Sequence, residues 1–489
     1  MAKRSTRPAT PPPKVARAPA PRTVDLRIAV AVVVGLAALV RLAATWNDLW
    51  LDEIWSLNLL DTLHSPVEIV TSLHHDNNHV LNSLFLYWLR PLGSDWLYRL
   101  PALLAGIATV GLGAWFATLE DVPSTAPQSR ALMAAIVLGV SLPLIQYGSE
   151  ARGYAMALAF GIGAISIAVR DDVRPMSTAA PAVWALLILA FLSHALALHV
   201  MTALGAWAAV RALRRDGWLR GAGTLAWWFA VPFAGFAAFW AYFLRDITVG
   251  GSNREGIGPP LARAVYVVSG LPREIPLAVS LVLVLAVAGA GLWVVAQRRS
   301  DLWVLFTVGM ILSPAALAII QPTNNYAERY FLVSMLLWLL LAAQLLAWLV
   351  ARGGAARVAA FVALAAFGVA NGARVADLLR DGRGSYQEAI RWMITHTDGD
   401  TTFIASDHDF RNRLIVEYYG PRMSKPVRYV SRADGSPTQW YVWQKTPGEA
   451  APIPRIAIPR GTYRLVKTYP TAPLSGLTWY VYERESPAG

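Results

Sequence analysis

The chain has 489 residues, of which 55% are apolar and 15% charged, and it carries a net charge of +12. This apolar fraction exceeds what the core of a soluble domain needs and is typical of a membrane protein. The absence of cysteine excludes disulfide bonds, a cysteine zinc site and a thiol nucleophile. Because the basic residues lie in short loops and a tail, the composition argues against nucleic acid as a partner and for a lipid bilayer.

The chain begins with a proline-rich basic segment, residues 1–26, which is typical of a disordered cytoplasmic tail. A signal peptide with its apolar core at residues 28–40 is the alternative, but the long tail and the later apolar stretches favour an uncleaved first helix. The apolar stretches predict about eleven transmembrane helices, near residues 27–46, 99–117, 131–146, 152–169, 181–194, 196–210, 224–243, 274–296, 302–320, 330–350 and 355–372.

Each connection after an even-numbered helix, from the fourth helix onward, contains arginines. By the positive-inside rule these connections are cytoplasmic, together with the N-terminus. They contain Arg170, Arg174, Arg211, Arg214, Arg215, Arg220, Arg298, Arg299, Arg352 and Arg357. An integral protein of the bacterial plasma (inner) membrane is therefore expected, with a membrane domain at residues 27–372 and an extracytoplasmic domain at residues 373–489.

The stretch 181–210 decides this topology. One helix of that length would measure about 45 Å, whereas the hydrocarbon layer is about 30 Å thick. Two short helices meeting at Ser193 and His194 fit better, and broken backbone at such depth is tolerated only where it is buried or lines a wet cavity. The sequence thus predicts a cavity that opens outward, with residues 47–98, 147–154, 244–273 and 321–329 on the outer side.

Two groups of polar residues in the first outer loop suggest chemistry. Asp52 and Glu53 are adjacent carboxylates that offer a general base or a metal ligand, with a solvated acidic turn as the alternative. His75 and His79 are four residues apart, so on a helical turn, together with Asp76, they would face a shared metal ion or a hydroxyl-rich ligand. A polar loop with chance histidines is the alternative.

Three further segments are candidates for substrate binding. Glu150, Arg152 and Tyr154 lie in a short turn, where arginine is well shaped to bind a phosphate unless the first two residues pair with each other. Arg329 and Tyr330 stand at the mouth of the tenth helix with the same options. Arg41, late in the first helix, either extends outward or faces the cavity, and His194 is an interior histidine unless the helix junction exposes it.

Such a cavity suits transfer of a group that is attached to a lipid phosphate. A carboxylate would take the proton of an acceptor hydroxyl, and the arginines would stabilise charge on the departing phosphate. The sequence contains no nucleotide-binding loop of the Walker or dinucleotide type. The alternatives are a transporter or flippase of a lipid-linked sugar, which predicts midplane charges and repeats, and a non-catalytic cell-envelope assembly protein.

In chain order, Arg41, Asp52-Glu53, Arg99-Leu100-Pro101, Ser149 to Tyr154, and Glu328-Arg329-Tyr330 resemble the motifs of the GT-C membrane glycosyltransferases. The nearest group is the protein O-mannosyltransferases and lipid A aminoarabinose transferases. The motifs are short, and their order over residues 25–345 makes the resemblance specific. It implies a GT-C-like helical fold and an inverting hexosyl or pentosyl transferase.

The donor implied by this resemblance is a polyprenyl-phosphate-linked sugar, and the acceptor is a lipid, a glycan or a protein. Asp52 is implied as the base with Glu53 in support, and Arg329 and Arg152 as residues near the carrier phosphate. Residues 74–79 depart from the family pattern of an acid followed by prolines. A divalent metal ion occurs in parts of the superfamily, and the sequence does not decide whether this chain binds one.

The C-terminal segment predicts a small α/β domain, either for acceptor docking or as a structural cap. Ser385 and Glu388 have the spacing of a capping box at the start of a helix that runs to about Thr395. Strands are expected at residues 401–405, 463–467 and 478–483.

Overall fold

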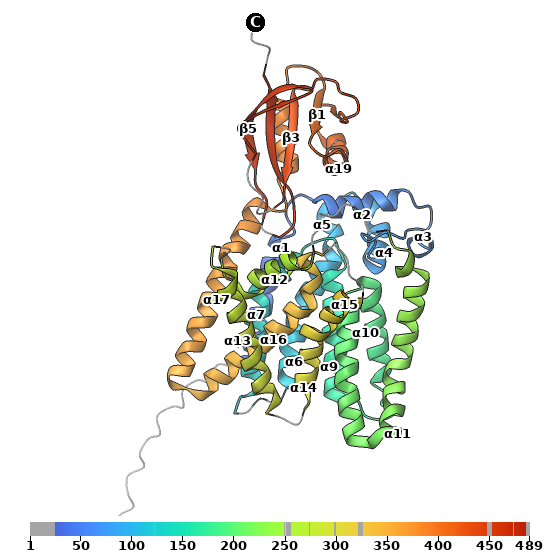
Figure 1. Cartoon of the computed structure of the whole chain (residues 1–489), viewed down its shortest axis with the longest axis vertical. Helices are drawn as coiled ribbons and strands as arrows, with labels where there is room; N and C mark the ends of the chain where they lie inside the picture. Colours follow the sequence, from blue (N-terminus) through green and yellow to red (C-terminus); the bar gives the residue numbers. More distant parts are fainter. Residues whose placement is uncertain are drawn as a thin grey trace, which may run out of the picture.

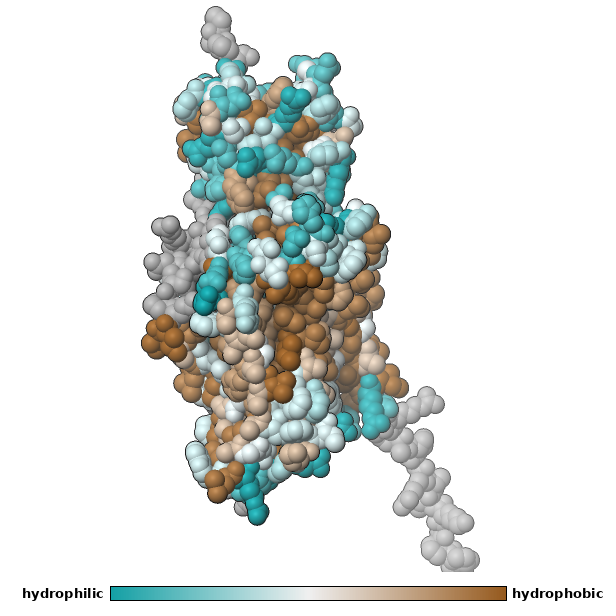
Figure 2. All heavy atoms as spheres, turned by 90° about the vertical axis from the view of Figure 1, so that its right-hand side faces the viewer, coloured by the Kyte–Doolittle hydropathy of each residue, from teal (hydrophilic) through white to brown (hydrophobic). Residues whose placement is uncertain are grey.

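The computed structural model describes residues 25–489, except residues 121, 123, 249, 251–255, 273, 298–299, 321–325, 447–451, 473 and 486–489. A body of long helices carries a small α/β domain at one end (Figure 1). On the face shown in Figure 2, an apolar band crosses the helical body between two more polar zones. This distribution of side chains is the one expected for a body embedded in a bilayer.

Each of the eleven apolar stretches coincides with a helix of this body. Its helices are α1 (Leu26–Ala43), α6 (Leu100–Leu119), α7 (Pro127–Val140), α8 (Leu142–Tyr147), α9 (Tyr154–Asp171), α10 (Ala180–Ser193), α11 (Ala197–Tyr242), α13 (Leu277–Ala296), α14 (Leu302–Thr307), which continues through the π turn η3 (Val308–Leu312) into α15 (Ser313–Ile320), α16 (Leu332–Arg352) and α17 (Gly354–Asp381). In the described part of the chain, eight helical segments are long and apolar enough to cross a membrane, and α7 and α10 are shorter apolar helices. The number of spans stays a prediction.

Two breaks in the helices agree with the sequence. Helix α11 is interrupted at Gly217, whose φ of +73° lies in the left-handed region that glycine adopts without strain. This break separates the predicted helices 196–210 and 224–243. The second break is the junction between α10 and α11, where His194 is extended (φ −168°, ψ 143°). The prediction that residues 181–210 are broken into two helices at Ser193 and His194 is therefore confirmed, although the second helix continues beyond residue 210 to Gly217.

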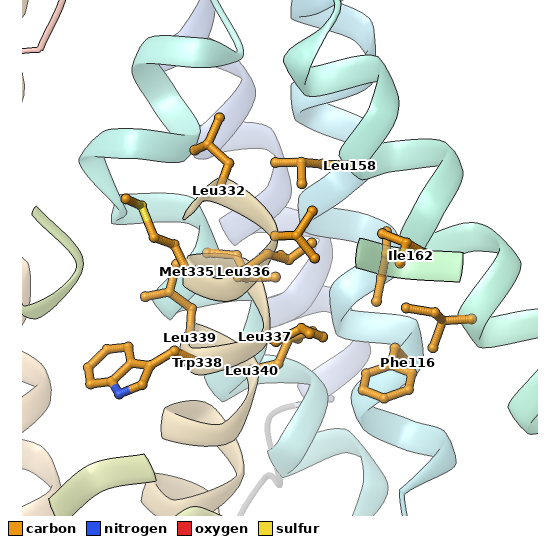
Figure 3. Packing of buried hydrophobic residues seen from close by; sticks show 14 of the residues in the cluster. Phe116, Leu158, Ile162, Leu332, Met335, Leu336, Leu337, Trp338, Leu339 and Leu340 are labelled. Atoms are coloured by element: carbon orange, nitrogen blue, oxygen red, sulfur yellow. The ribbon is translucent and has the colours of Figure 1, made fainter. Parts of the chain in front are cut away.

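Helix α16 lies at the centre of the core, because its leucines are buried nearly all the way round. Leu337, Leu339 and Leu340 point to different sides of the helix, yet each is at most 1% exposed and belongs to the same core cluster as Phe116 and Ile162 (Figure 3). A helix that is apolar on every side is typical of the interior of a helical bundle. Helices α7, α13 and α17 pack against α16, and α6, α9, α11 and α14 also contact it.

Short helices cover the end of the body that carries the α/β domain (Figure 1). The first loop, residues 47–98, contains α2 (Leu51–Asp61), α3 (Glu68–Thr71), α4 (Val80–Leu89), η1 (Arg90–Leu92) and α5 (Asp95–Tyr98). The later connections contribute η2 (Leu244–Asp246), α12 (Gly258–Ser269) and η4 (Glu328–Phe331).

The C-terminal domain contains a six-stranded sheet of order β2-β1-β3-β6-β5-β4. Strand β1 is parallel to β2 and β3, whereas the other pairs are antiparallel. The elements are α18 (Tyr386–Thr395), β1 (Thr402–Ser406), α19 (Asp409–Tyr419), η5 (Gly420–Arg422), β2 (Val427–Tyr429), β3 (Trp440–Lys445), β4 (Arg455–Ile458), β5 (Gly461–Tyr469) and β6 (Thr478–Arg484). The predicted α/β class, helix α18 and the three predicted strands are confirmed; α19, β2, β3 and β4 were not predicted.

The start of this domain differs from the prediction in two ways. Helix α17 continues to Asp381, beyond the expected end at residue 372. The prediction of a capping box at the start of α18 is wrong, because the Ser385 side chain accepts no capping hydrogen bond. Instead, the backbone and side-chain nitrogens of Gln387 donate to the carboxylate of Asp48, at 2.7 and 2.8 Å. The first loop therefore caps α18 and ties the domain to the helical body.

Asp407, directly after β1, makes the stability of this domain depend on pH. Its Oδ1 accepts hydrogen bonds from the Gln444 backbone and the Asn412 side chain, at 3.2 and 3.3 Å, yet burial raises the pKa of Asp407 from 3.8 to about 6. A raised pKa means that the folded state binds the proton more tightly, so this stabilisation is present below about pH 4 and is lost as the pH rises through about 6. We expect the melting temperature of the full protein in detergent to fall more between pH 4.5 and pH 6.5 than that of the Asp407→Asn variant. Equal losses in both proteins would contradict this assignment.

Candidate active site

A cavity of about 690 Å³ lies where the helical body, the first loop and the C-terminal domain meet. Eight of the residues singled out from the sequence line it: Asp52, Asp76, His79, Arg152, Tyr154, His194, Arg329 and Tyr330. They come from segments up to 278 positions apart in the chain, from residue 52 to residue 330. The prediction that the α10–α11 junction borders a cavity is confirmed.

The carboxylate of Asp52 faces two arginines on the cavity wall. Asp52 lies in the first turn of α2, and its Oδ2 contacts Nη1 of Arg152 and lies 3.7 Å from Nη2 of Arg329. The Asp52 side chain is 13% exposed. Two positive charges against one negative charge, in a partly desolvated place, leave a local excess of positive charge that an anion would neutralise.

Both arginines keep donors that the described residues do not use. The Nε atoms of Arg152 and Arg329 are buried and have no hydrogen-bond partner among the described residues. Nδ1 of His79 accepts from the Gly153 backbone at 2.9 Å, so a neutral His79 carries its proton on Nε2, which faces Nη2 of Arg152 at 3.4 Å. Two donors thus point at each other. An oxygen-rich anion would satisfy this corner, which the protein itself leaves short of acceptors.

His79 is neutral under ordinary conditions. Burial lowers its pKa well below the usual value, and the nearby charges of Arg152, His194 and Arg329 lower it further. His79 therefore adds no positive charge near pH 7. Its ring instead contacts the rings of Tyr154 and His194, at centroid distances of 5.1 and 4.6 Å, and these rings form an aromatic wall beside Arg152.

The turn that carries Arg152 lies close to the α10–α11 junction because residue 153 is glycine. A Cβ atom at Gly153 would come within 1.9 Å of the Ser193 carbonyl oxygen and 3.0 Å of the His79 Cβ. We expect Gly153→Ala to cost about 1–3 kcal/mol of stability through overpacking and to reduce activity by shifting Arg152. Gly205→Ala on α11 is the control, since no described heavy atom lies within 4 Å of its Cβ position. Thermal unfolding in detergent compares the two; equal melting temperatures would contradict this view of Gly153.

Glu53 does not line the cavity, although it was predicted to support the base. It is fully buried and accepts hydrogen bonds from Nε and Nη2 of Arg99, at 2.8 and 2.6 Å, and from the Ala151 backbone at 2.7 Å. Burial by itself raises the pKa of Glu53, but Arg99, with help from Arg383 and the Ala151 backbone, outweighs burial and holds the pKa below its usual value. The charged pair therefore stabilises the fold at neutral pH and loses this effect as the pH falls through that lowered value. Glu53 joins the first loop to the Arg152 turn.

Glu150 also lies outside the cavity, and it does not pair with Arg152. Its Oε1 lies 3.2 Å from Nε of Arg383 and contacts the hydroxyl of Ser475. Arg383 further donates to the Gln146 carbonyl and the Ser149 hydroxyl, both at 2.8 Å. Glu150 is therefore an anchor for the start of the C-terminal domain and for its connection between β5 and β6.

Arg41 neither extends outward nor faces the cavity. It is fully buried, and its guanidinium donates to the carbonyls of Ala37, Leu138 and Gly139, at 3.1 to 3.2 Å. The last two carbonyls belong to the end of α7, where the break before α8 leaves them without intrahelical partners. Arg41 thus closes a helix end inside the body.

His75 and His79 do not share a helix face, so this prediction is wrong. His75 forms an isolated bridge with Thr248 and packs on Trp55 with ring centroids 4.5 Å apart, whereas His79 precedes α4 as its N-cap. The residues in between form a turn because Asn77 and Asn78 bond to backbone carbonyls of α2 and of the segment around α3. In the described part of the chain, no group of three or more His, Asp or Glu residues is placed to hold a metal ion.

Sequence reasoning missed three residues that hold or line the site. Arg99 was noted only as part of a motif and Arg383 not at all, yet they neutralise Glu53 and Glu150. Arg263 of α12 lines the cavity and bonds Glu328 at 3.0 Å. The only signal in the sequence was the presence of arginines in otherwise polar connections, which does not reveal their partners.

No family profile and no curated protein matches the sequence. The structure is similar to the oligosaccharyltransferase of Archaeoglobus fulgidus in complex with zinc and sulfate, with 11% identity, a TM-score of 0.42 and coverage of 84% of this chain and 68% of that chain. It is also similar to ArnT from Cupriavidus metallidurans. The apo form has 14% identity, a TM-score of 0.46 and coverage of 86% and 93%. The form bound to undecaprenyl phosphate has 12% identity, a TM-score of 0.47 and coverage of 93% and 97%.

These proteins are membrane glycosyltransferases of the GT-C fold, the class that the sequence motifs resemble. At identities of 11–14%, the similarity is one of fold.

Proposed function

We propose that this chain is a glycosyltransferase that moves a sugar from a polyprenyl-phosphate carrier to an acceptor on the extracytoplasmic face. The observation that carries the proposal is the cluster of Asp52, Arg152 and Arg329 on the wall of a cavity next to a large apolar body. Helix α11 turns at the end of the helical body that lies opposite the C-terminal domain (Figure 1). Arg211 and Arg214 precede this turn at Gly217 and pair with Asp172 and Asp301. The cavity, in contrast, is lined by residues of the first loop and of the C-terminal domain. By the positive-inside rule, this arrangement favours an outward-facing cavity.

The carrier phosphate takes the place of the Asp52 carboxylate between the two arginines. A phosphodiester carries one negative charge and, like a carboxylate, offers oxygens to the parallel donors of a guanidinium. It supplies acceptors to the Nε atoms of Arg152 and Arg329, which have none among the described residues. Donor binding therefore releases Asp52 from its ion pairs and makes its carboxylate available to the acceptor.

The transfer itself is a single displacement at the anomeric carbon. The acceptor hydroxyl oxygen forms a bond to this carbon while its proton passes to Asp52. The bond from the anomeric carbon to the phosphate oxygen breaks, and its electron pair leaves with the carrier phosphate, whose charge the arginines stabilise. A single displacement inverts the anomeric configuration. Attack at C1 requires base and phosphate on opposite sides of the sugar, so Asp52 must move away from Arg152 as the donor enters.

The test supplies radiolabelled polyprenyl-phosphate sugars to membranes that contain the protein, with nucleotide sugars in a parallel arm. The proposal predicts label in a lipid, glycan or protein product from the polyprenyl donors alone. Label that stays on the carrier and only changes its side of the membrane would identify a flippase. Label that stays on the carrier and on its side would favour the assembly protein.

A further inference from the structure

One end of the C-terminal sheet, where β3 and β5 finish and β6 starts, faces the helical body. Lys445, at the end of β3, pairs with Thr478 at the start of β6, and Tyr469, at the end of β5, pairs with Trp479. The connection between β5 and β6 therefore lies at the same end of the sheet as the carboxyl end of β3. This connection enters the helical body, because Ala472 and Leu474 belong to the main core cluster of that body.

The same end of the sheet contains its topological switch point. From β1 the chain passes through α19 to β2 on one side, and it then returns to β3 on the other side of β1. In open α/β sheets, ligands bind in the crevice that such a reversal creates at the carboxyl ends of the strands. Phe410 and Arg411, which follow β1, and Thr446, which follows β3, line the cavity that contains Asp52. The crevice thus opens into the proposed catalytic cavity.

Helix α2 connects the crevice to Asp52. Asp52 and Trp55 are three residues apart on α2, which puts them on one face of the helix, and both line the cavity. The ring of Trp55 contacts that of Phe410 with centroids 4.8 Å apart. Asp76 lines the same cavity and is 30% exposed, with Oδ1 accepting from the Gly250 backbone at 3.2 Å. Aromatic rings, a guanidinium, a carboxylate and a hydroxyl therefore stand within one continuous cavity.

This set of groups matches the chemistry of a sugar. The C–H faces of a sugar ring pack on aromatic side chains, and its hydroxyls, which both donate and accept, pair with arginine and carboxylate groups. A peptide acceptor would need a row of unpaired backbone groups, for instance on a sheet edge. The strands nearest the cavity, β1 and β3, are each paired on both sides.

We propose that the acceptor crevice, formed by Trp55, Asp76, Phe410, Arg411 and Thr446, binds a carbohydrate acceptor. This inference rests on the proposed function. The terminal sugar of the acceptor places one hydroxyl at Asp52, and the preceding sugar residues occupy the crevice under the C-terminal sheet. A polysaccharide and the headgroup of a glycolipid share this chemistry, and fractionation of the product separates the two sources.

The absence of cysteine from the chain allows a sharp test. In the purified full-length protein, Thr446→Cys is modified with a biotin maleimide and compared with the same variant before modification. Ala433→Cys, on an exposed part of the same domain, is the control. The acceptors supplied are a cell-envelope polysaccharide fraction and a glycolipid fraction. Each sample is assayed for retention of a radiolabelled polyprenyl-phosphate sugar and for its KM for the acceptor.

We expect modification at position 446 to raise the KM for the carbohydrate acceptor at least tenfold and to change donor retention less than twofold. The modified control should keep both values. An unchanged KM after complete modification, or label that wild type places in protein, would overturn the crevice while the proposed function stands. Failure of wild type to retain or use the donor would instead contradict the proposed function. If Thr446→Cys does not fold, Arg411→Ala gives the same comparison, with the KM for the acceptor expected to rise and donor retention to stay.

Discussion

Asp52→Asn is expected to lower kcat for sugar transfer by about a thousandfold, within the usual range for loss of a general base. Asparagine has nearly the same shape but cannot take the acceptor proton. It also removes the negative charge that now faces Arg152 and Arg329. The KM for the donor should therefore fall or stay constant while kcat collapses. Steady-state kinetics with a labelled polyprenyl-phosphate sugar measure both quantities.

Asp61→Asn is the matched control for this variant. Asp61 lies at the other end of the same helix, its side chain is 70% exposed, and its contact with Arg90 is 3.4 Å. A solvated ion pair of this kind contributes about 1 kcal/mol or less, so this variant should transfer sugar at nearly the wild-type rate. If Asp52→Asn also kept the wild-type rate, Asp52 would not be the base.

Glu53→Gln is expected to reduce the free energy of unfolding by about 3–5 kcal/mol, the typical cost of leaving one member of a buried ion pair without its partner. Glu53 and Arg99 are both fully buried, and each carboxylate oxygen of Glu53 accepts a hydrogen bond from Arg99. The neutral amide would leave the Arg99 charge uncompensated. Thermal unfolding in detergent should show a large decrease in melting temperature.

Glu388→Gln is the control, because the Glu388 side chain is 64% exposed and lies 3.7 Å from Lys467. It should melt close to wild type. The two neighbouring carboxylates of the sequence would then have separate roles, chemistry for Asp52 and stability for Glu53. A Glu53→Gln protein with wild-type stability and no transfer would reverse that assignment.

Much of the helical architecture follows from the sequence, because the membrane imposes simple length and charge rules. The junction at His194 was predicted because one helix over residues 181–210 would be too long for the bilayer and would place the two flanking arginine-bearing connections on opposite sides. The break at Gly217 falls inside the arginine-rich connection that was expected there. These features depend on residues that are near each other in sequence.

The partners of the buried charges did not follow from the sequence. Glu53 and Glu150 were grouped with Asp52 and Arg152 because they are neighbours in the chain, whereas their charges are neutralised by Arg99 and Arg383. The choice between facing the cavity and facing the protein is made by tertiary packing. Asp52 faces the cavity although it is one residue from Glu53, because successive residues on a helix point about 100° apart.

No local signal in the sequence indicated that the C-terminal domain helps to line the cavity. The sequence predicted strands near residues 463–467 and 478–483, but nothing in the connection between them indicated that Leu474 enters the helical core. Strand β3 was missed although it has six residues and is rich in aromatic side chains. The switch point became visible only when the order of the strands was known.

In the proposed mechanism, the carrier phosphate takes the place of Asp52 between Arg152 and Arg329. Equilibrium binding of polyprenyl phosphate to the purified protein tests it most directly, in wild type, Asp52→Asn, Arg152→Gln and Arg329→Gln, with Arg352→Gln as a control at the end of α16. Removal of the competing carboxylate should tighten binding about tenfold, and loss of either arginine should weaken it by about the same factor, as expected for charge-assisted hydrogen bonds worth roughly 1.5 kcal/mol. Equal affinity in all five proteins would contradict the claim.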